Sequence, residues 1–110
     1  EADIIFSTAK AGIQILNAEV LSHAKQLKVA GDVNAVPPSG IAGIQLKDFG
    51  APLVHATSAT NPVGIGPLAV GNIKYKVQHA LLASMLASKK PVYLDFIAAF
   101  EKAKEILQDK

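Results

Sequence analysis

The spacing of apolar residues changes near residue 67 and divides the chain into two predicted regions. Before that point, short runs of β-branched and other apolar residues are closed by small or polar residues, a pattern typical of strands. These runs predict strands at residues 3–7, 28–34 and 52–57. After that point, apolar residues recur at three- and four-residue steps, which is the period of an amphipathic helix.

Local capping signals place the predicted helices. Asn17 is a predicted N-cap for a helix over residues 18–26, because its side chain can accept from the first free backbone amides. A long helix is predicted to begin at Pro67, which suits the first helical position, and to end before Pro91. A last helix is predicted over residues 95–108.

This order of elements predicts an α/β fold with a parallel sheet of about three strands. Parallel sheets are normally covered on both faces, so three strands are too few for a complete one. The first predicted strand also begins only a few residues after Glu1. We therefore expect these strands to be one side of a larger sheet.

Length and composition indicate a single small domain whose hydrophobic core is not complete within these 110 residues. The chain has 110 residues, of which 50% are hydrophobic. A domain of this size buries only about 65% of its unfolded surface when it folds alone. The apolar excess therefore suggests that part of the core is completed by another piece of protein.

Charge and residue usage exclude several classes of protein. All eleven basic residues are lysines, the net charge is +2, and cysteine is absent. Nucleic-acid binding is disfavoured because arginine and basic clusters are missing, and disulfides and thiolate metal sites are excluded. Neither a membrane-spanning run nor a basic leader is present in the sequence. We expect no membrane or nucleic-acid partner, and we favour the cytoplasm as the location of the protein.

Small residues follow the first predicted strand. Ser7, Thr8 and Ala9 lie at its carboxyl end, which is where open α/β sheets bind their ligands. Their small side chains would let a ribose or nicotinamide approach the backbone. An ordinary strand-to-helix turn explains the same residues and is favoured when the pattern is taken alone.

A more specific pattern ends the second predicted strand. Asp32 and Asn34 are two residues apart and are followed by Ala35, Val36 and a double proline. The amide of Asn34 offers both a donor and an acceptor to a carboxamide or a ribose hydroxyl. Asparagine also commonly bonds the turn that follows it, and the pattern does not separate these two interpretations.

A glycine-rich segment leads into the long helix. Gly64, Gly66 and Leu68 lie where backbone amides at a helix start can meet an anion or a carbonyl. The spacing is not that of the dinucleotide fingerprint, and the residues just before Gly64 are not expected to form a strand. Lys74 and Lys76 follow on the helix but lie on different sides of it, so at most one of them faces a cleft.

Other common site chemistries find no support. The three histidines are far apart in sequence and have no ligand spacing, so no metal site is predicted. No serine lies in the glycine-flanked elbow of a hydrolase.

Three segments together resemble one family. They are ADIIFSTA at residues 2–9, DVNAVPPSGI at residues 32–41 and GIGPLAVGNIK at residues 64–74. The chain resembles the NAD(P)-dependent methylene-tetrahydromethanopterin dehydrogenases of methylotrophic bacteria along essentially its whole length. A looser likeness to bifunctional methylene-tetrahydrofolate dehydrogenase/cyclohydrolases is visible in the strand that ends at Asn34 and in the glycine–proline entry to the long helix.

The resemblance implies a larger enzyme. The family has an N-terminal pterin-binding domain and a Rossmann-like NADP domain, joined by long helices, with the substrate between them. Residues 1–110 would be the second half of the Rossmann-like domain with an interdomain helix and a C-terminal helix. The first half of that domain, with its phosphate loop, and the pterin domain have no counterpart in this sequence. We therefore expect the chain alone to be inactive, its partners to include the rest of the same enzyme, and the enzyme to be a homo-oligomer.

The resemblance also implies the reaction and its residues. Hydride passes from the methylene group of a pterin-bound one-carbon unit to C4 of NADP⁺ (or NAD⁺), without metal or flavin. The residues implied at the cofactor are Ser7, Thr8 and Ala9 at the ribose, Asn34 and Ala35 near the nicotinamide, and Gly64, Gly66 and Leu68 near its carboxamide. Lys74 would orient the pterin. Alternatives are a folate-type dehydrogenase and a non-catalytic half-Rossmann assembly module.

Overall fold

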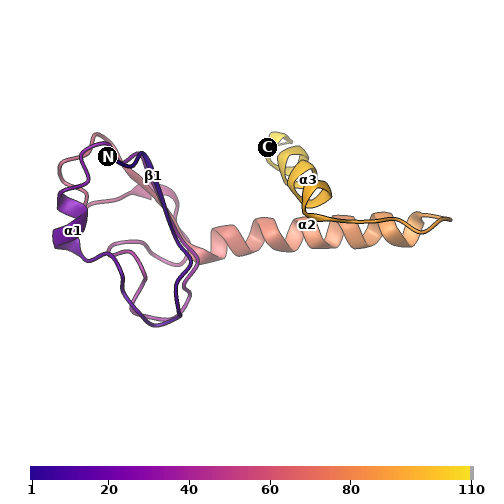
Figure 1. Ribbon diagram of the computed structural model, residues 1–110, viewed down its shortest axis with the longest axis horizontal. Helices are drawn as coiled ribbons and strands as arrows, with labels where there is room; N and C mark the ends of the chain where they lie inside the picture. The colour runs from indigo at the N-terminus through magenta and orange to yellow at the C-terminus, as the bar shows by residue number, and fades with distance from the viewer. Residues whose placement is uncertain (110) are drawn as a thin grey trace. The chain divides into compact units, whose positions relative to one another are not determined.

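The computed structural model describes residues 1–109, which divide into two compact units, Glu1–Val70 and a helical unit that begins at Gly71. The chain is α/β, as its sequence predicts (Figure 1). Its elements are β1 (Ile4–Ser7), α1 (Ala18–Ser22), β2 (Val29–Asp32), β3 (Phe49–Pro52), β4 (Val63–Ile65), α2 (Pro67–Ala87) and α3 (Phe96–Gln108).

The first unit contains a four-stranded sheet with the order β1-β2-β4-β3. Strands β1, β2 and β4 are parallel, whereas β3 is antiparallel to β4. The sheet therefore has one strand more than predicted and is mixed. The strand predicted at residues 52–57 is wrong beyond Pro52, because the chain turns there through bonds from Ala56 N to Leu53 O and from Ala59 N to Ala56 O.

Strand β4 was not expected from the sequence. It has three residues, begins directly after Pro62 and has a glycine at its centre, so its intrinsic strand preference is weak. It forms because β2 and β3 pair with it from both sides. Gly64 also suits this place, since a Cβ there would lie 3.2 Å from the Ile44 side chain.

Helix α1 starts where predicted and ends earlier. Asn17 caps it, with the side chain accepting from Val20 N. After Ser22 the backbone bonds tighten to three-residue steps, from His23 N to Val20 O and from Ala24 N to Leu21 O. The helix predicted to residue 26 therefore gives way to a tighter turn that leads to the buried Leu27.

One face of the sheet carries the core. Ile5 and Ala30 are paired in register and point to this side, where the loops and α1 cover them. The buried members of the core cluster are Leu21, Leu27, Ala30, Ile41, Ala42, Ile44, Leu53 and Ala56. All of them belong to the first unit.

The opposite face of the sheet is open at β1, which is an edge strand. The exposed fractions of Ile4 and Phe6 are 58% and 63%. The Phe6 ring lies over Gly31 of β2, where an added Cβ would come within 2.5 Å of it. The apolar sequence of β1 is typical of a buried strand, but within the described residues only one face of β1 is covered.

The second unit is helical. Helix α2 starts at Pro67, as predicted, and ends at Ala87, before the two lysines. Asp95 caps α3 by accepting from Ala98 N. Val77 is the one buried hydrophobic side chain between Gly71 and residue 109. No helix in the described part of the chain has the length and apolar character needed to cross a membrane.

Candidate functional site

The predicted site residues of the first two strands lie at one end of the sheet. Ser7 ends β1, Asp32 ends β2, and the two residues are paired in parallel register. The segments that follow, residues 8–16 and 33–42, therefore leave the sheet side by side. This is the end of a parallel sheet at which ligands bind in open α/β folds.

Hydrogen bonds join these two segments to each other. The backbone amides of Ile15 and Leu16 both donate to Gly40 O, at 2.8 and 3.0 Å. Leu16 O accepts from Ala42 N at 2.8 Å, and the Gln14 side chain donates to Ser39 O. Since these bonds hold the loops together, the two predicted contact segments are kept close at the strand ends.

Asn34 bonds the turn that contains it. Its Oδ1 accepts from Val36 N at 2.9 Å and from Gly12 N at 3.3 Å, and its Nδ2 donates to Pro38 O at 2.9 Å. The side chain is 6% exposed. The turn-bonding interpretation of Asn34 is therefore confirmed. Its contact with a cofactor stays a prediction, for which the second N–H of the amide remains the natural donor.

The hydrogen bonds made by Asp32 were not predicted from the sequence. Its carboxylate is fully buried and accepts from Asn34 N at 3.0 Å and from Ile41 N at 3.2 Å. It thus ties the first residues of the loop to its last. The strand predicted over residues 28–34 ends at Asp32, so Asn34 lies in the following loop and its backbone amide donates to the Asp32 side chain.

Ser7 and Gly40 pack against this carboxylate. A Cβ on Gly40 would lie 2.5 Å from Ser7 Oγ and 2.9 Å from Asp32 Oδ1, so only glycine fits there without a shift. Ser7 Oγ is buried and has no hydrogen-bond partner within the described residues. Buried hydroxyls are usually hydrogen-bonded, so Ser7 Oγ is a group that a polar ligand or a water molecule could satisfy.

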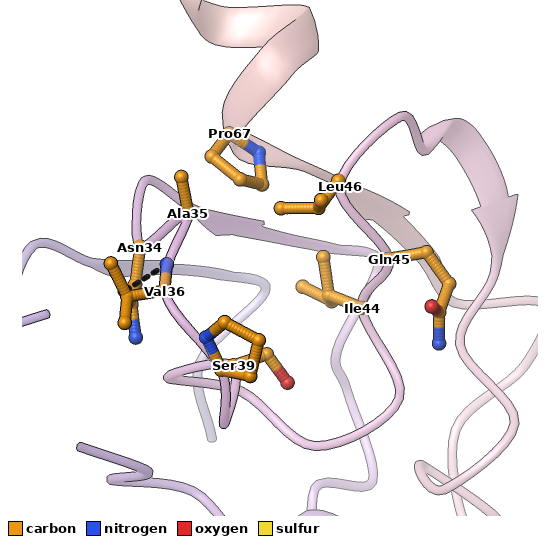
Figure 2. A pocket seen from close by; sticks show the side chains of 9 residues that line it. Asn34, Ala35, Val36, Ser39, Ile44, Gln45, Leu46 and Pro67 are labelled. Atoms are coloured by element: carbon orange, nitrogen blue, oxygen red, sulfur yellow. Dashed lines mark hydrogen bonds between the residues drawn. The ribbon is translucent and has the colours of Figure 1, made fainter. Parts of the chain in front are cut away.

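A pocket of about 250 Å³ opens beside the Asn34 loop. Figure 2 shows residues 34–36 on one side of this pocket, residues 44–46 on the other and Pro67 at one end. The wall is mixed: Asn34, Ser39 and Gln45 are polar, and the other lining residues are apolar. We call it the Asn34 pocket.

A second pocket lies beside the end of β1. It has a volume of about 390 Å³ and is lined by Ile5, Phe6, Ser7, Thr8, Ala9, Ile15 and Leu16. The three residues predicted at the ribose thus line one pocket together. The two predicted near the nicotinamide line the Asn34 pocket, so the structure brings these five residues to the same end of the sheet in two adjoining groups.

The glycine segment lies less favourably for a ligand. Gly66 N donates to Asp48 O at 2.8 Å, and Leu68 N donates to Leu46 O at 2.9 Å. A Cβ on Gly66 would collide with the backbone oxygens of Gln45 and Leu46. The backbone amides of Gly66 and Leu68 therefore already donate to carbonyl groups of the chain. The predicted contacts of Gly64, Gly66 and Leu68 with a carboxamide gain no support from this geometry.

Lys74 belongs to the second unit, where it is exposed on α2. Tyr75, beside it, stacks on His79 with ring centroids 6.1 Å apart. The role of Lys74 at a substrate stays a prediction.

Among the described residues, a pair of side chains with shifted pKa values lies at the other end of the sheet. The Lys28 ammonium lies 2.8 Å from Asp3, which lowers the pKa of that carboxyl and raises the pKa of Lys28. Both side chains are exposed. No group of histidine and acidic residues in the described chain is arranged to hold a metal ion.

The residues at this end of the sheet fit the nicotinamide side of a dinucleotide. Pockets that enclose a drug-sized ligand have about 300–1,000 Å³, so the Asn34 pocket suits one ring rather than a whole dinucleotide. The apolar lining residues suit the ring, and the unpartnered Ser7 hydroxyl suits a polar neighbour. Within the described residues, neither β1 nor β2 is followed by a glycine-rich loop that leads into a long helix, which is the arrangement that binds the pyrophosphate in Rossmann folds.

Comparison with known proteins supports the resemblance seen in the three sequence segments. Over 106 residues, or 96% of this chain, the sequence is 48% identical to an NAD(P)-dependent methylenetetrahydromethanopterin dehydrogenase of Methylorubrum extorquens. It is 27% identical over 105 residues to the bifunctional protein MdtA of the same organism. The chain spans 34% of each relative, about a third of their length. No family model matches it.

Proposed function

We propose that this chain is part of an NAD(P)-dependent methylenetetrahydromethanopterin dehydrogenase and that it supplies the nicotinamide side of the cofactor site. The observation that carries the proposal is the 48% identity over 96% of the chain. At that level the fold and the local geometry of aligned residues are expected to be retained. The two contact segments identified from the sequence also lie together at the carboxyl end of β1 and β2.

The dinucleotide would supply the hydride acceptor, which lies outside the chemistry of amino-acid side chains. The chain's own task is placement. Ala35 and the other apolar residues of the Asn34 pocket receive the ring, and Thr8 and Ala9 leave room for the ribose. Fixing two reactants in a near-attack geometry accounts for a large part of such catalysis, so a site with few ionisable groups is adequate.

Lys74 is proposed to orient the pterin rather than to transfer a proton. It is exposed on α2, and a lysine carries three donors on a flexible stem. Because hydride leaves the methylene carbon directly, no acid or base is required at that carbon. Neutralising Lys74 should therefore raise the KM for the pterin more than it lowers kcat.

The open face of the sheet supports a larger enzyme. Ile4 and Phe6 are more than half exposed on an edge strand, although parallel sheets are normally covered on both faces. The proposal places the rest of the same polypeptide over this face and includes a homo-oligomer in the cytoplasm, without nucleic-acid partners. The 110 residues alone are expected to be inactive.

The test uses the intact protein that carries this sequence. NADP⁺ and methylene-tetrahydromethanopterin are mixed with it, and the absorbance band of NADPH is followed. The proposal predicts growth of this band, with NAD⁺ as the parallel cofactor. If the band grows only with methylene-tetrahydrofolate, the folate-type dehydrogenase replaces the proposal, and no growth with either substrate favours the assembly module.

A further inference from the structure

We infer that Asp32 is a positioning residue that fixes the loop of residues 33–41 in the shape that presents Asn34 and Ala35 to the dinucleotide. The inference rests on the proposed function and adds to it a residue that does not itself line the Asn34 pocket. It starts from an acid in an unusual place. Asp32 is 0% exposed, and no cation among residues 1–109 pairs with it.

Burying a carboxyl group is unfavourable unless hydrogen bonds replace the lost water. Asp32 gains two, from Asn34 N to one oxygen and from Ile41 N to the other. The two amides come from opposite ends of the loop, so the carboxylate closes the loop as a clasp. An apolar side chain of similar size would fill the same volume but would leave both amides unpaired.

The clasp acts on the pocket through Asn34. With its backbone held by Asp32, the Asn34 side chain bonds Val36 N and Pro38 O across the loop and Gly12 N in the neighbouring segment. Residues 34–37 and 39 line the Asn34 pocket (Figure 2). The shape of one wall of the pocket therefore depends on two sets of hydrogen bonds: those of Asp32 close the whole loop, and those of Asn34 fix residues 34–38 within it.

Gly40 completes the arrangement. Its missing side chain leaves the space in which Ser7 Oγ and Asp32 Oδ1 lie, and its carbonyl accepts from Ile15 N and Leu16 N. A methyl group at this position would push on the carboxylate without removing it. Substitutions at Asp32 and at Gly40 should therefore disturb the conformation of the same loop by two independent routes.

The experiment compares Asp32→Asn with Gly40→Ala in the intact protein. Asp32→Asn keeps the shape, but it turns an amide NH₂ towards one of the two backbone donors. The dissociation constant for NADP⁺ is measured by fluorescence titration, and the exchange rates of the Asn34 and Ile41 amide hydrogens are measured by NMR. We expect both variants to weaken NADP⁺ binding at least about tenfold, with faster exchange of both amides.

Leu27→Val is the matched control for general loss of stability. Leu27 is 1% exposed in the same core but lies before β2, at the other end of the sheet. It should lower the unfolding midpoint and leave the NADP⁺ dissociation constant within about twofold. All titrations are made at a temperature where unfolding curves show each variant to be folded.

The outcomes separate the two proposals. Asp32→Asn that binds NADP⁺ as tightly as the wild type would overturn the positioning role. So would a Leu27→Val variant of equal stability that loses as much NADP⁺ affinity as Asp32→Asn, because general loss of stability would then explain the effect. Wild-type protein that binds NADP⁺ but does not oxidise the pterin would overturn the proposed substrate while leaving the positioning role of Asp32 in force. If Asp32→Asn is too unstable to titrate, Gly40→Ala decides by the same two criteria.

Discussion

The two units of this chain differ in how much of their apolar surface they bury. The first unit holds all eight members of the buried core cluster and closes its loops with side-chain to backbone bonds. The second unit buries Val77, while Tyr93, Leu86 and Phe96 are each more than four-fifths exposed. The first unit therefore has a buried core that fixes its loops, whereas the helices of the second unit leave most of their large apolar side chains exposed within the described residues.

The largest expected difference comes from one substitution made in both units. Leu21→Ala removes a fully buried side chain from the core and should lower the free energy of unfolding by about 2–5 kcal/mol. Leu86→Ala, at an 83% exposed position, should change it by less than about 0.5 kcal/mol. Urea unfolding of the 110-residue chain measures both. Equal losses would mean that the second unit has a core of its own.

Alanine substitutions at one glycine in each unit should change the stability in opposite directions. Gly66→Ala forces a methyl group against the Gln45 and Leu46 carbonyls and should destabilise by about 3 kcal/mol, the upper end for overpacking. Gly71→Ala adds a methyl group in open space on α2 and should stabilise by about 0.5–1 kcal/mol through helix propensity. Thermal unfolding should show a lower midpoint for Gly66→Ala and a higher one for Gly71→Ala. A Gly66→Ala variant as stable as the wild type would contradict the packing described at Gly66.

Removal of the N-cap of α1 or of α3 should give a smaller loss of stability that differs in how far it spreads. Asn17 and Asp95 make the same bond to the third residue of their helices, each at 2.9 Å. Either change to alanine should cost about 1 kcal/mol. Asn17→Ala should lower the stability of the whole first unit, because α1 carries the buried Leu21, whereas Asp95→Ala should speed amide exchange only in α3. Loss spread over the whole chain in both variants would contradict this separation.

The smallest effect concerns the exposed pair at the amino end of β1. Asp3 has a lowered pKa, so its stabilising contribution is present at neutral pH and is lost as pH falls through about 4. Lys28 has a raised pKa, so its contribution is lost as pH rises above about 10.4. Asp3→Asn should flatten the acid side of the stability profile slightly. An unchanged profile would show that solvent screens the pair completely.

Sequence patterns predicted the helices better than the sheet. Pro67 is a local signal for the start of α2, and the helical spacing of apolar residues predicted α3 to within one residue of its observed start. Strand β4 has the opposite character, because a three-residue segment with a central glycine becomes a strand only through its neighbours. The end of α1 at Ser22 likewise depends on how Leu27 enters the core, which no local pattern records.

The sequence pattern predicted that Ser7 and Asn34 lie at the same end of the sheet, but it did not predict the hydrogen bonds around them. Ser7 and Asn34 follow strands, and the rule that ligands bind at carboxyl ends brings them together. The bonds from Asp32 to both ends of its loop join residues up to nine positions apart, and the Gly40 contact joins three segments. Such contacts depend on the loop conformation, which the sequence pattern did not specify.

The ends of β1 and β2 are proposed to receive the nicotinamide half of a dinucleotide. Titration of the ¹⁵N-labelled 110-residue chain with nicotinamide mononucleotide, and separately with adenosine monophosphate, tests this proposal by NMR. We expect the nicotinamide compound to shift the amide signals of Thr8, Ala9 and Ala35 and the adenosine compound to leave them unchanged. Shifts of these signals by adenosine monophosphate, or by neither compound, would contradict it.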